Sequence, residues 1–296
     1  MYSEPVTKRA TGIALIAVAA TLWGTWPLYT RASGVSGVSI GFLALMMMAL
    51  PAPFAFKRAA FADRGAVVAL VLVGLADAAN VVLYFSALER GPVVVGVLSH
   101  YLAPTLVALG APLLLKEAGS PRALWASPVV LIGLALVLGY GSANTGAFLT
   151  AGLGGASAIF YAGVVLGSRR ASRSFSPLAV MSLHSVISAV TLALIFGREV
   201  LPASADRGLA LLLFGCLVNG LVAALLFNLS LQRLEAQLVG LLTYLEPLTA
   251  ALIGVIVLGD PFGPASAAGL ILILAAGGWA ASAPPQRIEV VPIAEP

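Results

Sequence analysis

Apolar stretches of roughly membrane length recur along the whole chain, and they limit its fold more than any other feature. Ten of them are bounded by charges or by glycine and proline clusters, at residues 11–30, 36–56, 66–86, 92–115, 123–140, 145–167, 177–197, 208–231, 236–258 and 263–281. A helix of about 20 apolar residues crosses the hydrocarbon core of a bilayer. The stretches lack the two-residue alternation of a β-barrel, so ten transmembrane helices are predicted.

The composition supports an all-α polytopic membrane protein. Apolar residues make up 60% of the 296 residues and charged residues 9%, and the mean hydropathy is +1.03. This leaves too little polar surface to cover a soluble globule. The net charge of +4 is read as an orientation signal, so no nucleic-acid partner is expected. With Cys216 as its single cysteine, the chain forms no intrachain disulfide.

The distribution of lysine and arginine predicts that both termini lie in the cytoplasm. Twelve basic residues then fall on the cytoplasmic side: Lys8, Arg9, Lys57, Arg58, Arg64, Lys116, Arg122, Arg169, Arg170, Arg173, Arg233 and Arg287. Only four fall outside: Arg31, Arg90, Arg198 and Arg207. This excess obeys the positive-inside rule, and an even number of helices returns the chain to the starting side. Residues 283–296 are predicted to form a flexible cytoplasmic tail.

A repeated motif divides the chain into two halves. Tyr101-Leu-Ala-Pro104 returns as Tyr244-Leu-Glu-Pro247, which is 143 residues later, and Arg90 meets Arg233 at the same offset. The predicted halves are residues 1–141 and 142–282, with five helices each. Because five is odd, the second half crosses the membrane in the opposite sense, and an inverted repeat is predicted.

Four ionisable residues lie within the apolar stretches: Asp77, His100, His184 and Glu246. Such residues are costly in hydrocarbon and normally face a cavity or a polar partner. Asp77, Asn80 and Tyr84 follow i, i+3, i+7 spacing, which places them on one helix face. That stripe lines a cavity, or else Asp77 lies near one end and bonds to a neighbouring helix or to solvent. His184 shares its face with Ser188 and Thr191, and packing between helices is the alternative role there.

The prolines of the repeat place a polar group beside an opened backbone. Pro104 and Pro247 lack the N–H that would bond the carbonyls of His100 and Thr243, so each helix is predicted to kink. His100 could bind a substrate ammonium or carboxylate, or it could hold the kink across the bundle. Glu246 is the strongest site candidate: it takes up a proton and couples export to the proton gradient, accepts an ammonium group, or stays protonated as a structural residue.

Aromatic side chains lie within the same helices. Trp23 and Tyr161 sit some way inside their stretches, so they form either an aromatic wall for a ligand or part of the interfacial belts. The pairs Gly37-x-x-x-Gly41 and Gly163-x-x-x-Gly167 permit close helix approach, and a monomer or weak homodimer is expected. The chain lacks a His-Glu-x-x-His zinc motif, a cysteine pair and a phosphate loop, so neither an enzyme nor a metal site is predicted.

Several of these motifs together resemble the drug/metabolite transporter superfamily in its EamA-type branch. They are Leu22-Trp23-Gly24, the two Tyr-Leu-x-Pro motifs and the acidic residue that follows each of the two Leu-rich helices, in Lys116-Glu117 and Gly259-Asp260. The stretch from Val95 to Leu106 is similar to that of the YddG group of bacterial aromatic amino-acid exporters. The resemblance implies export of amino acids across a bacterial inner membrane, with alternating access through a central cavity. Ala103 replaces a residue that is often aromatic in those exporters, which puts exclusive aromatic specificity in doubt.

The sequence therefore predicts an exporter of aromatic and other neutral amino acids, such as methionine or threonine, that needs no cofactor beyond a coupled proton. Two alternatives stay open: a transporter of phosphorylated or nucleotide sugars, and a non-transporting receptor or assembly factor. The candidate substrate-binding residues are Trp23, Asp77, Asn80, Tyr84, His100, Tyr101, Tyr161, His184, Tyr244 and Glu246, with kinks at Pro104 and Pro247.

Overall fold

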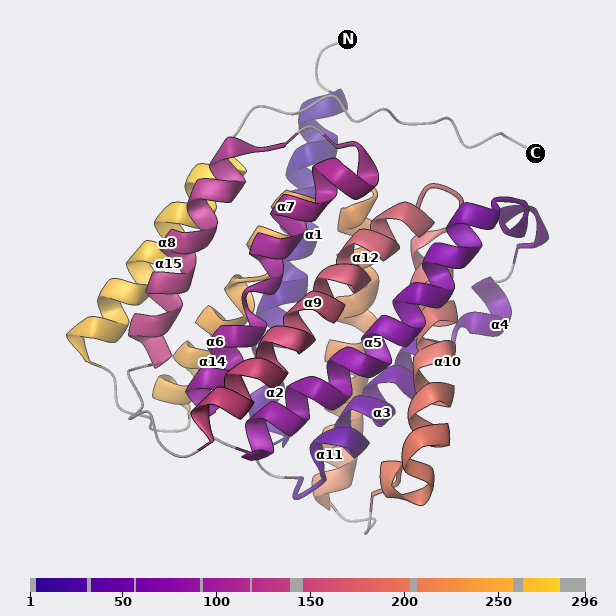
Figure 1. Ribbon diagram of the computed structural model, residues 1–296, viewed down its shortest axis with the longest axis horizontal. Helices are drawn as coiled ribbons and strands as arrows, with labels where there is room; N and C mark the ends of the chain where they lie inside the picture. Colours follow the sequence, from indigo (N-terminus) through magenta and orange to yellow (C-terminus); the bar gives the residue numbers. More distant parts are fainter. Residues whose placement is uncertain are drawn as a thin grey trace.

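A computed structural model describes residues 4–30, 33–55, 57–90, 93–117, 119–138, 146–202, 207–257 and 263–282. Regular structure in these ranges is entirely helical (Figure 1). In chain order the elements are α1 (Glu4–Trp23), α2 (Trp26–Thr30), α3 (Gly37–Ala49), α4 (Ala52–Ala55), η1 (Arg58–Ala62), α5 (Arg64–Arg90), α6 (Val93–His100), α7 (Ala103–Leu115), α8 (Pro121–Leu138), α9 (Ala147–Ala171), α10 (Pro177–Phe196), η2 (Gly197–Val200), α11 (Arg207–Gly215), η3 (Cys216–Ala223), α12 (Ala224–Leu231), α13 (Ala236–Leu242), α14 (Leu245–Ile256) and α15 (Pro264–Ala281).

Seven helical spans in the described ranges are long and apolar enough to cross a membrane. They cover Thr7–Thr30, Arg64–Ala87, Val95–Leu115, Ala147–Ala171, Pro177–Val200, Arg207–Leu231 and Ala236–Ile253. The three other predicted segments contain shorter apolar helices, at Gly37–Ala49, Pro121–Leu136 and Pro264–Ala280. The chain is therefore a multi-pass helical membrane protein. The predicted tail, residues 283–296, lies outside the described residues.

Polar contacts gather several helix ends at one end of the bundle, which we call the N-terminal end because α1 begins there. Arg9 of α1 bonds Glu235, which precedes α13, and the Ser120 amide, before α8, bonds Gln237 of α13. Arg122 of α8 bonds Ser282, which follows α15. The first and last helices described therefore begin and end on the same side of the bundle, at the top of Figure 1.

The two predicted halves interleave instead of lying side by side. The most extensive helix packing joins α5 to α9 and α8 to α15, and α1 packs on α12. Each of these pairs takes one helix from before residue 141 and one from after residue 142. One buried apolar cluster accordingly combines Ile16 of α1, Val107 of α7, Val165 of α9 and Phe227 of α12. The centre of the protein is thus built jointly by both halves.

Glycines allow backbones to touch where helices cross. A Cβ on Gly24 would clash with Thr249 Cβ and would lie 2.6 Å from the Glu246 carbonyl oxygen. A Cβ on Gly74 of α5 would lie 2.6 Å from Ile187 Cβ of α10. Both distances are too short for real contacts, so these positions require glycine.

Candidate functional site

Two helix breaks meet near the centre of the bundle. α6 ends at His100, Tyr101 and Leu102 form a turn, and α7 begins at Ala103 with Pro104 in its first turn. α13 ends at Leu242 and α14 begins at Leu245, with Pro247 likewise in the first turn. Proline is tolerated there because first-turn amides lack helical partners.

The tyrosines of the two breaks hold them together. The Tyr244 hydroxyl donates to the Tyr101 carbonyl at 2.7 Å, and the two rings stack with centroids 5.8 Å apart. In the second break the Thr243 carbonyl accepts from the Glu246 amide at 2.9 Å, so a local turn partly satisfies the group that Pro247 leaves without its usual donor. The repeated motif therefore brings its own two copies into contact.

An aromatic cluster surrounds His100. Its ring centroid lies 4.4 Å from that of Tyr84 on α5, 5.3 Å from that of Tyr161 on α9 and 5.5 Å from that of Tyr101. Tyr101 is buried, whereas Tyr84, His100 and Tyr161 keep part of their surface accessible. Three helices distant in sequence thus present rings and hydroxyl groups to one place.

Glu246 brings a carboxyl group to this cluster. The carboxyl interacts electrostatically with the hydroxyls of Tyr84, Tyr101 and Tyr161, and it too keeps part of its surface accessible. A carboxyl group among electron-rich rings suits a cationic group such as an ammonium.

A chain of hydrogen bonds extends from His100 to Asp77. His100 Nδ1 lies 2.9 Å from Ser157 Oγ of α9, and that hydroxyl donates to Asn80 Oδ1 at 2.8 Å. Asn80 Nδ2 in turn donates to Asp77 Oδ1 at 3.5 Å. Sequence reasoning did not find Ser157, because a serine in a helix rich in glycine and alanine resembles an ordinary packing residue.

Two of the predicted site residues lie outside the aromatic cluster. His184 of α10 has its Nδ1 2.6 Å from the Val180 carbonyl oxygen. Its Nε2 lies 3.5 Å from Asp77 Oδ2, at the opposite end of the hydrogen-bonded chain from His100. Trp23 donates its indole N–H to the Asn219 carbonyl at 2.8 Å, and its ring lies 5.4 Å from that of Phe227. The structure thus joins Tyr84, His100, Tyr101, Tyr161, Tyr244 and Glu246 directly, with Asp77 and Asn80 attached by hydrogen bonds.

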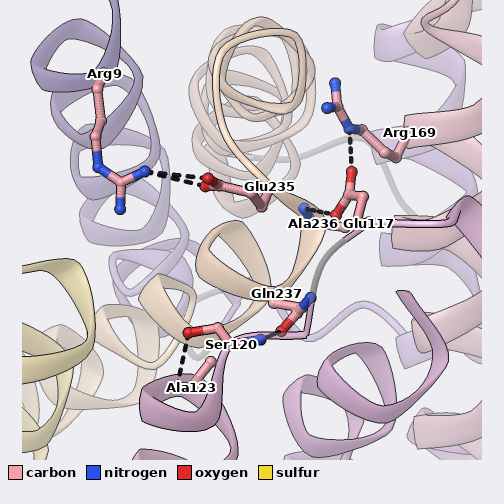
Figure 2. Close-up of polar contacts among 8 residues, drawn as sticks. All are labelled: Arg9, Glu117, Ser120, Ala123, Arg169, Glu235, Ala236 and Gln237. Atoms are coloured by element: carbon pink, nitrogen blue, oxygen red, sulfur yellow. Dashed lines mark hydrogen bonds and ion pairs between the residues drawn. The ribbon is translucent and has the colours of Figure 1, made fainter. Parts of the chain in front are cut away.

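A second polar network ties the halves together at the N-terminal end of the bundle (Figure 2). Glu117, which follows α7, receives a hydrogen bond from Arg169 Nε at 2.7 Å and another from the Ala236 amide at 2.9 Å. That amide begins α13, where backbone donors lack helical partners and a negative charge is favoured. Glu117 therefore links α7 to both α9 and α13.

Two further contacts complete this network, which we call the terminal latch: Arg9, Glu117, Ser120, Arg169, Glu235, Ala236 and Gln237. Arg9 Nη1 lies 3.2 Å from both oxygens of Glu235. The Ser120 amide donates to Gln237 Oε1 at 2.8 Å. Every one of these bonds joins a residue before 141 to one after 142, and the charged side chains keep 15% or less of their surface exposed. The latch therefore ties α1, α7 and the segment before α8 to α9 and α13 at this end.

Asp63 anchors the loop before α5 at the same end. Its carboxylate accepts two bonds from Arg170 at 3.1 Å, one from Ser174 at 2.6 Å and one from the Ala66 amide at 3.0 Å. The Arg170 guanidinium contributes most to holding the pKa of Asp63 well below its usual range, followed by the Ser174 hydroxyl and the Ala66 amide.

A groove of about 440 Å³ lies on α5, α7 and α9, away from the aromatic cluster. Its wall is apolar apart from Arg170, and it includes the exposed side chains of Leu72 and Leu114. We assign the aromatic cluster as the candidate site because several polar groups converge there and a single charged residue borders the groove. The described residues contain no group of three or more His, Cys, Asp or Glu that could hold a metal ion.

Comparison with known proteins identifies the family. The model of the EamA-like transporter family matches twice, at residues 10–139 and again at residues 149–277. The chain belongs to the EamA-like transporter family. It is therefore a multi-pass membrane transporter of the drug/metabolite transporter superfamily.

Relatives of this EamA-family chain are themselves named as transporters. An uncharacterized transporter of Archaeoglobus fulgidus is 29% identical over 273 residues, which cover 89% of this chain and 94% of the relative. The uncharacterized transporter YwfM of Bacillus subtilis is 26% identical over 79% of this chain and 70% of its own length. A solved crystal structure shares the fold with a TM-score of 0.77 at 21% identity, covering 92% of this chain and 96% of that one. These names agree with transport.

Proposed function

We propose that this EamA-family transporter exports neutral amino acids, aromatic ones prominent among them, by alternating access to the aromatic cluster. The observation that carries the proposal is Glu246 among Tyr84, Tyr101 and Tyr161 at the meeting of two broken helices. The carboxylate accepts the substrate ammonium, the rings contact its side chain, and His100 offers a polar group beside them. No cofactor is required. The similarity of residues 95–106 to the YddG exporters supports the same substrate class.

The surroundings of Glu246 disfavour a phosphorylated substrate. A transporter of sugar phosphates or nucleotide sugars needs cationic groups to meet the phosphate. Among the described residues, the groups interacting with Glu246 are tyrosines, and His100 is the only basic side chain in ring contact with them. A receptor or assembly factor would have no need for a carboxyl group within apolar membrane helices.

We further propose ten transmembrane helices arranged as an inverted repeat of residues 1–141 and 142–282. Two family matches of similar length support the repeat. Helix packing supports it as well: α5 on α9 has its counterpart in α12 on α1, as expected if the five segments of each half correspond in order. The three shorter apolar helices complete the ten crossings.

The terminal latch lies on the cytoplasmic side in this proposal, with both termini in the cytoplasm of a bacterial cell and the chain in its inner membrane. The positive-inside rule supports this, because Arg9, Arg122, Arg169 and Arg170 gather at this end. The structure then corresponds to the conformer closed toward the cytoplasm, and the latch separates when the site opens inward. The functional unit is a monomer or a weak homodimer.

Counterflow in liposomes tests the proposed substrate. Purified protein is reconstituted with unlabelled phenylalanine, methionine or threonine inside, and entry of the labelled amino acid is followed. We expect counterflow for at least one of the three, its loss in Glu246→Gln, and its retention in Glu199→Gln, which makes the same change at an exposed residue of η2. Flux no higher than in empty liposomes for every amino acid would reject the proposal. A stable protein partner in pull-down without flux would support a receptor instead.

A further inference from the structure

Asp77 and His184 form a buried pair between helices of different halves. Asp77 of α5 is 9% exposed and His184 of α10 is 3% exposed, and Asp77 Oδ2 lies 3.5 Å from His184 Nε2. The helices touch closely here, because Ser188 of α10 donates to the Gly74 carbonyl of α5 at 2.8 Å. A change in the charge of this pair therefore acts directly on the contact between the halves.

The hydrogen bonds around His184 show where its protons lie. Nδ1 is 2.6 Å from the Val180 carbonyl, which only accepts, so Nδ1 carries a hydrogen. Nε2 faces Asp77 Oδ2 and, also at 3.5 Å, the hydroxyl oxygen of Ser185. Ser185 donates its own hydrogen to the Met181 carbonyl at 2.7 Å, so it offers Nε2 only a lone pair.

Asp77 Oδ2 and Ser185 Oγ can therefore only accept a hydrogen bond from Nε2, unless a further proton is bound to the Asp77–His184 pair. Without that proton, the lone pair of a neutral imidazole faces a buried carboxylate, and the contact is repulsive. With it, the pair is either an imidazolium beside a carboxylate or a neutral imidazole bonded to a carboxylic acid, and both arrangements are attractive. Tyr161 of α9 is a further titratable group that interacts with Asp77.

We propose that the Asp77–His184 pair is the binding site of a proton that this transporter carries as its coupling ion. The inference rests on the proposed transport function and separates the coupling site from the substrate site at Glu246. The bound proton holds α5 against α10. Proton binding and the conformer in which α5 packs on α10 favour each other, so the site holds its proton less tightly once the halves have rearranged and releases it on the side that is then open.

The hydrogen-bonded chain described above connects this site to the substrate site. Ser157 gives its hydrogen to Asn80, so His100 Nδ1 must donate to Ser157. In each hydrogen bond of the chain the residue nearer His100 is then the donor, and the last of these bonds runs from Asn80 to Asp77. Asn80 does not ionise, so no proton passes along these hydrogen bonds. A change in the charge of Asp77 instead reorients Asn80, and through it Ser157 and His100. Proton binding at Asp77 thereby sets the orientation of His100 beside the substrate.

Two measurements on reconstituted protein separate the roles. Counterflow of labelled phenylalanine without a pH gradient reports substrate exchange, whereas uphill accumulation driven by a pH gradient reports coupling. We expect Asp77→Asn and His184→Gln to lose uphill accumulation and substrate-dependent proton movement, with a smaller fractional loss of counterflow. Ser185→Ala, which removes a neighbouring hydroxyl but no ionisable group, should keep all three activities. Uphill accumulation preserved in Asp77→Asn, or an absence of proton movement in the unmodified protein, would overturn the proposal.

Infrared titration tests the proton site without any substrate. The unmodified protein should show a pH-dependent carboxyl or imidazolium band that disappears in both Asp77→Asn and His184→Gln, with Ser185→Ala unchanged. A spectrum in which neither variant removes a titrating band would overturn the site even if amino acids are transported. Conversely, the expected titration without counterflow for any amino acid would reject the proposed substrate and leave the proton site standing.

Discussion

Replacing Glu117 by alanine should open the terminal latch. The substitution removes the bond from Arg169 at 2.7 Å and the bond from the first amide of α13 at 2.9 Å. It also leaves the Arg169 guanidinium, whose side chain is 12% exposed, without its carboxylate. Arg9–Glu235 and Ser120–Gln237 remain, so the latch is weakened and not abolished.

The size of the effect follows from the two bonds. A hydrogen bond to a charged group contributes about 1.5–3 kcal/mol, and the relieved desolvation of Glu117 offsets part of the sum. A net loss of about 2–3 kcal/mol for the closed conformer changes the ratio of closed to open conformers by roughly 30- to 150-fold, because each 1.4 kcal/mol is tenfold.

Distance measurement between spin labels reads this change directly. Labels replace the exposed residues Lys8 and Gln232, which flank the latch on opposite halves, in a protein carrying Cys216→Ala. We expect one short distance with the native latch and a second, longer distance in Glu117→Ala. Glu199→Ala, an equal loss of charge on exposed η2, should leave the distribution unchanged. A folded Glu117→Ala protein with the native distribution would show that the latch does not control closure.

Three further predictions concern stability and site geometry. Gly24→Ala should lower the free energy of unfolding by about 1–3 kcal/mol, because the added Cβ meets the Glu246 backbone. Gly155 has open space around it, so the free energy of unfolding of Gly155→Ala should match or exceed the native value. Equal melting temperatures for the two variants would contradict this. Folding lowers the pKa of Asp63, so the stability that its carboxylate gives the folded protein is complete above about pH 4 and is lost as the pH falls further. The unfolding curves of Asp63→Asn and of the native protein should therefore converge in acid. Trp23→Phe should lower the free energy of unfolding by about 1 kcal/mol, because it loses the hydrogen bond to the Asn219 carbonyl, and it should leave the KM for substrate unchanged. A raised KM at native stability would instead place Trp23 against the substrate.

The sequence predicts where the helices of this protein lie along the chain better than it predicts which helices contact one another. Apolar length and proline position locate the breaks beside Pro104 and Pro247 to within a few residues, because both signals act locally along the chain. Three of the ten predicted segments contain shorter apolar helices, at Gly37–Ala49, Pro121–Leu136 and Pro264–Ala280. The first of these ends at the turn of Leu50 and Pro51, because proline disfavours a helical conformation in the residue before it.

The partners of the site residues depend on packing that sequence patterns record only weakly. In a membrane both lipid-facing and core-facing positions are apolar, so the pattern does not show which face of α9 meets α5. The rarity of ionisable residues in hydrocarbon singled out Asp77, His100 and Glu246. The bond through Ser157, and the pairing of His184 with Asp77 in place of the aromatic cluster, become visible only once the helices are assembled.

The interleaving of the two halves has a consequence for how the protein is made. Helix α5 is synthesised before its main partner α9, and α8 before α15, the last helix described. The helices before residue 141 are therefore made before α9 and α15 can pack on them, and Asp77 is made before its partner His184. A chain interrupted after residue 141 therefore lacks α9 and α15, the main packing partners of α5 and α8, and leaves those helix surfaces facing lipid.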